Sequence, residues 1–300
     1  MSHSHPLVSI GLPVYNGERY LATAIDVLLA QSFTDFELIL TDNASTDSTP
    51  EICARYVAQD RRVSYFRNAS NVGAAENHNI VFRKAQGTYF KWAGNDDGYA
   101  PTYLEECVAT LEREPTFVVA YPKTSVIDAA GNFVQNYEDN FHLDAAQPHL
   151  RFRYVLRHPK EEMLNPALGL TRTGVLRKTQ LIGNYFASDR VLLAELALYG
   201  KFYEVPNRLF FRRLHEESSS HNYLQDAKKS GWFNPANRGQ ISAPRWKRFV
   251  GYLQALKTAP LSGQERLLCS KEFAEFYLHP NRWRGAALDL AQIRRALGVG

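Results

Sequence analysis

Cysteine is scarce in this sequence, with three cysteines among 300 residues. Cys53, Cys107 and Cys269 lie far apart and form no C-x-x-C pair. This spacing argues against a zinc site and against a disulfide framework, and it fits a reducing compartment.

Long apolar runs are absent as well. The run Val191–Tyr199 is interrupted by Glu195, and no run approaches the length of a membrane span. Met1–Pro6 is polar, so no signal peptide is visible. We therefore expect a cytoplasmic protein.

The glycine-rich phosphate-binding motifs are missing too. The chain contains neither G-x-x-x-x-G-K-[ST] nor G-x-G-x-x-G, which disfavours a P-loop NTPase and a dinucleotide-dependent dehydrogenase. A nucleotide bound without such a loop needs another way to neutralise its phosphates. A metal ion held by carboxylates is the natural route.

The net charge of +4 is uneven along the chain. From Pro244 onward there are 10 Lys and Arg against 4 Asp and Glu, whereas the preceding part has 25 against 27. The basic character belongs to the C-terminal tail, so we expect no nucleic-acid partner.

Alternating strand and helix patterns in the first 120 residues predict an α/β fold. At this spacing the strands should pair in parallel through right-handed crossovers, giving an open, mostly parallel, Rossmann-like sheet flanked by helices. The predicted strands are Leu7–Pro13, Phe36–Thr41, Val63–Arg67 and Thr88–Ala93; the predicted helices are Leu21–Gln31, one starting near Pro50, Ala74–Ala85 and Leu104–Glu112.

The second half has weaker patterns. We divide the chain into a main domain over residues 1–230, whose halves meet near residue 122, and a C-terminal helical extension over 231–300, with the boundary in the polar stretch Leu224–Ser242. The predicted elements are the strand Phe117–Tyr121, a hairpin turn at Asp128–Asn132, the helix Leu150–Arg157, the strand Pro166–Leu170, the helix Thr173–Ile182, the helix Val191–Tyr199 and the strands Lys201–Val205 and Arg208–Arg212.

Polar residues follow the first, second and fourth predicted strands directly. They are Tyr15-Asn16, Asp42-Asn43 and Asp96-Asp97. Taken alone, the segment Gly94–Gly98 is more typical of a solvated turn. Ligands of open parallel sheets bind beyond the carboxyl ends of the strands, so the regular placement favours a site with a divalent cation on the two carboxylates.

Two further residues have both a structural and a functional interpretation. Asp189 opens a helix, where an Asp is most simply an N-cap, but a carboxylate there could also act as a general base. His215 cannot belong to an H-E-x-x-H zinc helix, because Ser219 stands at the second His position. A lone His is more often a surface or capping group, although it could complete a metal shell of carboxylate and phosphate.

The C-terminal extension begins with an amphipathic helical pattern. Trp246, Phe249 and Leu253 fall on one face, with Arg245 and Lys247 near them. We favour a helix that packs on the main domain. The alternative is peripheral contact with an anionic membrane surface through the basic C-terminal helices.

Five segments in order resemble the family 2 glycosyltransferases of the GT-A fold, over about residues 6–220. The segments are Val8-Ser9-Ile10-Gly11-Leu12-Pro13-Val14-Tyr15-Asn16, Asp42-Asn43-Ala44-Ser45-Thr46-Asp47-Ser48-Thr49, Asn71-x-Gly73 with Asn79, Ala85-x-Gly87-x-Tyr89 leading to Asn95-Asp96-Asp97, and Ser188-Asp189.

The resemblance implies a role for each segment. It assigns Asp96 and Asp97 to the divalent cation, Mn²⁺ or Mg²⁺, and to the diphosphate. Because Asn95 stands where the first Asp of the family motif usually stands, metal binding would rest mainly on Asp97. Asp189 would be the general base of an inverting enzyme, and His215 resembles a histidine that some members use near the metal. The residues implied for the nucleotide sugar are Pro13, Tyr15, Asn16, Glu18, Asp42, Asn43, Gly73, Asn79 and Asp96.

The resemblance thus implies an inverting, metal-dependent glycosyltransferase. Its donor would be a UDP-, GDP- or dTDP-linked sugar, and its acceptor a glycan or a lipid-linked hydroxyl. The alternatives are a sugar-phosphate nucleotidyltransferase, which would need a basic glycine-rich loop after the first strand, and a non-catalytic protein that binds nucleotide sugars.

Overall fold

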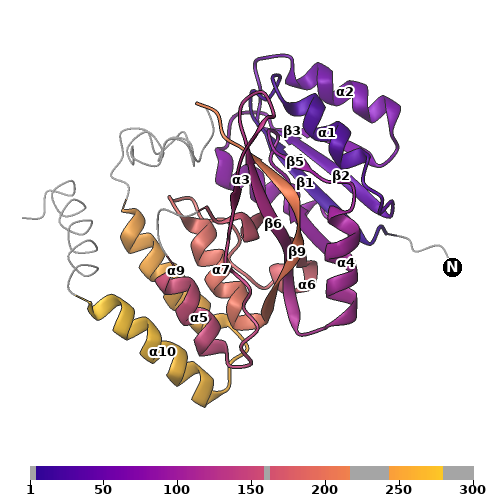
Figure 1. Ribbon diagram of the computed structural model, residues 1–300. Helices are drawn as coiled ribbons and strands as arrows, with labels where there is room; N and C mark the ends of the chain where they lie inside the picture. Colours follow the sequence, from indigo (N-terminus) through magenta and orange to yellow (C-terminus); the bar gives the residue numbers. More distant parts are fainter. Residues whose placement is uncertain (1–4, 159–162, 217–242, 280–300) are drawn as a thin grey trace, which may run out of the picture.

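The computed structural model describes residues 5–158, 163–216 and 243–279 of the chain. Within these residues a single mixed sheet of nine strands runs through the molecule, with helices on both of its faces (Figure 1). The order of its main path is β3-β2-β1-β4-β8-β6-β9-β5, and β7 pairs with β6. The predicted fold class is confirmed.

The first half of the sheet is parallel, as its pattern predicts. Its strands are β1 (Val8–Val14), β2 (Phe36–Asp42), β3 (Val63–Arg67) and β4 (Tyr89–Trp92). Every residue of β1 is buried, which is typical of a parallel strand covered on both faces. The crossover helices are α1 (Leu21–Leu29), α2 (Thr49–Gln59) and α3 (Ala74–Arg83).

The second half of the sheet mixes directions and differs from the predictions. β6 (Phe117–Ile127) is longer than predicted, and a β-hairpin connects it to β7 (Phe133–Tyr137) around the predicted turn. Two separate strands were predicted around residue 206, but β9 (Lys201–Arg213) is continuous. Pro206 and Asn207 form a bulge that has no partner in β6, which is how a strand can accommodate a proline.

Two predicted elements near residue 170 are wrong. A 3-10 helix, η1 (Asn165–Leu168), replaces most of the predicted strand Pro166–Leu170, and the observed strand β8 (Leu170–Arg172) overlaps it only at Leu170. The following helix α6 (Thr173–Leu176) is a single turn. Leu181 has a positive φ of 59°, which is incompatible with the helix predicted to continue to Ile182. The short strand β5 (Gly98–Tyr99), which pairs with β9, was not predicted.

Each face of the sheet has its own apolar core. Helices α1, α2 and α4 (Tyr103–Arg113) cover one face. The other face is covered by α3 and by a group of four helices, namely α5 (Pro148–Arg157), α7 (Ser188–Tyr199), α9 (Pro244–Thr258) and α10 (Gly263–Leu278) (Figure 1).

Helices α9 and α10 belong to this second core. Phe249 contacts the rings of Phe273 and Tyr277, with centroids 5.2 and 4.9 Å apart, and α9 packs on α7 while α10 packs on α5. The predicted packing of the C-terminal helix on the main domain is therefore confirmed for residues 243–279. The predicted boundary at Leu224–Ser242 falls outside the described residues. No helix in the part that the structure describes is both long and apolar enough to cross a bilayer.

Candidate active site

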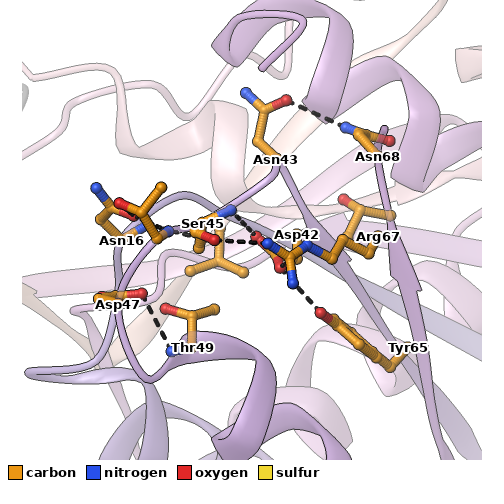
Figure 2. Close-up of polar contacts among 12 residues, drawn as sticks. Asn16, Asp42, Asn43, Ser45, Asp47, Thr49, Tyr65, Arg67 and Asn68 are labelled. Atoms are coloured by element: carbon orange, nitrogen blue, oxygen red, sulfur yellow. Dashed lines mark hydrogen bonds and ion pairs between the residues drawn. The ribbon is translucent and has the colours of Figure 1, made fainter. Parts of the chain in front are cut away.

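Asp42 lies at the carboxyl end of β2 in a dense polar network. Its side chain is wholly buried, and Figure 2 shows it between Ser45, Tyr65 and Arg67. Oδ1 accepts from the Ser45 backbone N–H (2.8 Å), and Oδ2 accepts from the Tyr65 hydroxyl (2.9 Å) and lies 3.4 Å from Arg67 Nε. The network holds one orientation of the carboxylate before any ligand binds.

The loop after β1 is connected to the loop after β2 by reciprocal hydrogen bonds. Asn16, with φ of 49°, donates from its backbone N–H to Ser45 Oγ (2.9 Å), and its Oδ1 accepts from the Thr46 N–H (2.9 Å). Glu18 accepts from the Ser48 N–H (3.1 Å) and donates its own N–H to an Asp47 oxygen (3.0 Å). These predicted residues shape the loops with the same groups that would contact a ligand.

Tyr15 and Pro13 occupy the same edge of the sheet in different ways. Pro13 is buried within β1 opposite Thr41. Tyr15 is 48% exposed and directly follows Val14, whose partner in β2 is Asp42. An exposed aromatic ring at this edge of the sheet can stack on a planar base.

Asn43 and Gly73 bring the start of α3 to this edge. Asn43 Oδ1 accepts from Asn68 Nδ2 (3.1 Å) and from the Val72 N–H (2.9 Å), and its Nδ2 donates to Asn71 Oδ1 (2.9 Å). Gly73 has a φ of 87°, a conformation that glycine adopts without strain, and α3 begins directly after it.

Asn79 lies away from this network. Its Nδ2 donates to the Ile182 carbonyl (2.9 Å) and its Oδ1 accepts from the Ile182 N–H (3.1 Å). It therefore fastens α3 to the segment that leads into α7.

Asp97 is the more deeply buried of the two adjacent carboxylates. Its Oδ2 lies 3.0 Å from Arg212 Nη1, and its Oδ1 accepts from the Arg213 N–H (3.1 Å). Burial raises the pKa of Asp97 to about 6, with Arg212 opposing the shift and Asp96 adding to it. Both oxygens are engaged within the protein, whereas the sequence placed the cation mainly on this residue.

Asp96 is the carboxylate that remains accessible. Its side chain is 22% exposed, and Oδ2 lies 2.9 Å from His215 Nε2. His215 Nδ1 is buried, and no described residue forms a hydrogen bond with it. The His215 ring is 5.0 Å from the Tyr20 ring, and Arg213 Nε donates to the Asp96 carbonyl (2.7 Å).

Asp96 and His215 offer one carboxylate and one imidazole nitrogen, 2.9 Å apart, as possible metal donors. Across residues 5–158, 163–216 and 243–279, no three His, Cys, Asp or Glu side chains are grouped so that they could hold a metal. A Mn²⁺ or Mg²⁺ ion that works on phosphates needs one or two protein carboxylates, because phosphate and water oxygens complete its shell. The two donors meet that lower requirement.

The loop after β4 rests on a buried cation that the sequence did not suggest. Lys91 Nζ donates to the Trp92 carbonyl (3.0 Å) and lies 4.1 Å from the centre of the Tyr99 ring. Burial lowers the pKa of Lys91 to about 7. The Tyr99 hydroxyl in turn accepts from the Gly94 N–H (3.1 Å), at the start of the loop that carries Asp96.

Asp189 lies in the first turn of α7 but does not cap it. The N-cap position is Ala187, which is left-handed with φ of 60°, and no side chain caps the helix, so the predicted N-cap role is wrong. Asp189 Oδ1 accepts from the Arg190 N–H (2.9 Å). Burial raises the pKa of Asp189, while that hydrogen bond and the charges of Arg190 and Arg248 oppose the rise.

Arg212 connects the two groups of carboxylates. Its pKa is raised even though burial opposes its charge, because Asp97, Asp96 and, more weakly, Asp189 all favour the cation. The charge of Asp189 thus acts on Arg212, the residue that pairs with Asp97. The loop after β1 reaches the loop after β4, since a Cβ on Gly17 would come 2.7 Å from Asn95 Nδ2.

Several residues of the site were missed by the sequence analysis. Arg67 and Tyr65 belong to β3, and Arg67 ends that strand, so the rule that selected Asp42 could have selected it as well. Lys91 and Arg212 lie within strands, and nothing in the local pattern marks them.

Known proteins of similar sequence and fold identify the family. The sequence model of the family described as "Glycosyl transferase family 2" matches residues 9–171. An uncharacterized glycosyltransferase of Haemophilus influenzae is 44% identical over 101 residues, which are 34% of this chain and 40% of that protein. The match thus spans about two fifths of the length of that relative.

Two solved structures share the fold. The Staphylococcus aureus protein TarS, residues 1–349, in complex with UDP-GlcNAc superposes with a TM-score of 0.68 at 16% identity, over 96% of this chain and 81% of that one. The mannosyltransferase PcManGT of Pyrobaculum calidifontis, in complex with GDP-Man and Mn²⁺, gives a TM-score of 0.54 at 17% identity, over 98% and 87%. Because the family model covers more than half of the sequence, this chain belongs to glycosyl transferase family 2.

Proposed function

We propose that this protein transfers a sugar from a nucleoside-diphosphate sugar to an acceptor hydroxyl with inversion at the anomeric carbon. The observation that carries the proposal is Asp96 paired with His215, beside the Asp97–Arg212 ion pair, at the edge of the sheet where Asp42 also lies. Family membership and the nucleotide sugars bound by TarS and PcManGT support this donor class.

The nucleoside would bind at the Asp42 network. Asp42, whose buried carboxylate is engaged by Ser45 and Tyr65, would hold the loops that contact the base and ribose, and the exposed Tyr15 ring offers a surface for stacking. Asn16, Glu18, Asn43 and Gly73 would shape this pocket. Asn79 would act at a distance, through the segment before α7.

The diphosphate would lie beside Asp96 and His215. These residues would hold Mn²⁺ or Mg²⁺, which neutralises charge on the departing diphosphate when it is bound. Asp97 and Arg212, paired behind the loop, would keep Asp96 in place. This assignment moves the main cation contact from Asp97 to Asp96.

Asp189 would be the general base. It takes the proton of the acceptor hydroxyl as the oxygen forms a bond to the anomeric carbon, and the bond from that carbon to the phosphate oxygen breaks. The diphosphate leaves with the electron pair on the opposite side, which inverts the anomeric centre. The raised pKa of Asp189 makes it a stronger base than an exposed aspartate.

The acceptor is proposed by chemical class alone. A glycan or a lipid-linked hydroxyl would approach from the side of α7, and peripheral membrane contact through the C-terminal helices is an extension of this proposal.

A donor panel tests the proposal. Thermal unfolding of the full chain would be followed with UDP, GDP, dTDP, UDP-GlcNAc and GDP-mannose, each with and without Mn²⁺. A ligand at about 100 times its Kd should stabilise the fold by about 2.7 kcal/mol, and Mn²⁺ should increase the shift. Asp96→Asn should remove the Mn²⁺ increment and keep the part due to the nucleoside.

The control is Asp35→Asn, at the opposite end of β2, which should respond as the wild type does. If no member of the panel raises the melting temperature, the donor class is wrong.

A further inference from the structure

Helices α7 and α9 both lie beyond the region that the family model matches, and α9 packs directly on α7, the helix that carries Asp189. The two helices approach closely at Gly251. A Cβ at this position would come 2.7 Å from the Tyr185 hydroxyl and 2.9 Å from Val191 Cγ1. Gln180 Nε2 also donates to the Gly251 carbonyl (3.0 Å). A side chain larger than hydrogen would push α9 away from α7.

Arg248 lies about one turn before Gly251 on α9 and reaches the turn that precedes α7. Its Nη1 donates to the Phe186 carbonyl (3.3 Å). The next residue, Ala187, has the left-handed φ of 60° that starts the helix two residues before Asp189. A non-glycine residue in this conformation is strained, so it needs contacts that hold it.

The guanidinium of Arg248 also acts on Asp189 through its charge. Burial raises the pKa of Asp189, and Arg248 on α9 opposes the rise together with Arg190 on α7. Tyr185, before α7, and Arg212, on β9, are further titratable groups that interact with Asp189. Arg248 is thus a contribution of α9 to the charge around this carboxylate.

We propose that Arg248 is a positioning residue for Asp189, and that α9 completes the catalytic centre by holding the turn at Phe186 and Ala187. The inference rests on the proposed role of Asp189 as the base. It also makes α9, which the family model does not reach, a part of the active protein.

A purely structural role for Arg248 predicts something different. A residue that only fastens α9 to α7 would lower the stability when replaced, without a specific effect on Asp189. The titration of the Asp189 carboxyl separates the two roles, because removing a nearby positive charge raises the pKa of a carboxyl group.

The test is an NMR titration of the full chain labelled with ¹³C at the aspartate carboxyl carbons. The signal that disappears in Asp189→Asn identifies Asp189. In Arg248→Met we expect its titration midpoint to rise, because a positive charge that favours the ionised carboxylate has been removed. Arg248→Lys, which keeps a charge, should recover most of this shift.

Lys257→Met is the matched control. It removes an exposed cation from the same helix, about 13 Å further along its axis at the usual rise per residue, and should leave the midpoint unchanged. If Arg248→Met does not fold, Arg248→Gln takes its place as the neutral polar variant. An unchanged midpoint in the folded neutral variant would overturn the inference.

A second measurement keeps the two proposals apart. The release of UDP from UDP-GlcNAc, or of GDP from GDP-mannose, is followed with Mn²⁺ for each variant. If Asp189→Asn releases nucleotide at the wild-type rate, the proposed function of Asp189 fails. If Asp189→Asn is inactive and the titration midpoint of Asp189 is the same with and without Arg248, only the inference about α9 fails.

Discussion

Lys91 carries its ammonium group inside the molecule, between the Tyr99 and Tyr103 rings and the Trp92 carbonyl. A buried cation of this kind loses much of its hydration, and the rings and the carbonyl replace only part of it. The lowered pKa of about 7 reflects that loss. Charge behind the loop that carries Asp96 is therefore sensitive to pH near neutrality.

Replacing Lys91 should change how stability depends on pH. Between about pH 7 and the unfolded value near 10.5, the unfolded state binds more protons at this residue than the folded state, so its contribution to the free energy of unfolding rises with pH. The slope is at most about 1.4 kcal/mol per pH unit. Urea unfolding of Lys91→Met should lack this contribution between pH 7 and 9.

The quantity to compare is the difference between variant and wild type, because cysteines and tyrosines also titrate as the pH rises. Lys178→Met, at an exposed position, serves as the control and should follow the wild type. A difference that stays constant over this range would show that Lys91 titrates normally.

Asp189 is the residue on which the chemistry depends most. Asp189→Asn keeps the size of the side chain but removes the base, so turnover should fall by about 10²–10⁴-fold. The melting-temperature shift with the best donor should be unchanged, since Asp189 is assigned to the acceptor side. Nucleotide release and thermal unfolding measure the two effects, and activity within threefold of wild type would exclude Asp189 as the base.

At the scale of elements, local patterns determine the first half of the fold. Strands β1 to β4 and their crossover helices have strong apolar periodicity, and their predicted ends differ from the structure by one or two residues. In the second half, β5 and β8 have two and three residues, and they exist because β9, β4 and β6 are there to pair with them. Pairings between distant segments leave no signal in a short window of sequence.

The residues of the site divide in the same way, into those that the local sequence marks and those that it does not. Asp42 and Asp96 could be selected because each directly follows a recognisable strand. Arg212 and Arg248 could not be selected, because their partners lie more than 50 residues away in sequence. Arg212 pairs with Asp97, and Arg248 donates to the Phe186 carbonyl. The choice between Asp96 and Asp97 as the main cation contact also required the structure, since these adjacent aspartates differ only in their burial and in their hydrogen-bond partners.

At the scale of the whole molecule, the C-terminal helices are part of the common core. Tyr252, Ala255 and Phe273 belong to the same apolar cluster as α5 and α7, so the described part of the predicted extension does not form a separate body. Salt bridges of Arg153 and Arg157 with Glu272 connect α5 to α10 at the surface.

Deleting residues 244–300 should therefore disrupt the fold rather than trim it. The apolar faces of α5 and α7 would be exposed to water, at a cost of roughly 25 cal/mol for each Å² uncovered. We expect the truncated chain to aggregate in size-exclusion chromatography and to lose its cooperative thermal transition. A monomeric fragment with an unchanged melting temperature would show that the extension is dispensable.

The strand β9 joins the two halves of the site through two consecutive arginines. Side chains alternate along a strand, so Arg212 turns to Asp97 while Arg213 turns to the Asp96 carbonyl and to the carbonyls of the β6–β7 hairpin. An odd number of residues inserted or lost between the Pro206 bulge and Arg212 would turn each arginine to the opposite face of the sheet. An even number would leave each arginine on its present face. Sequence drift in this strand is thus constrained by count as well as by residue type.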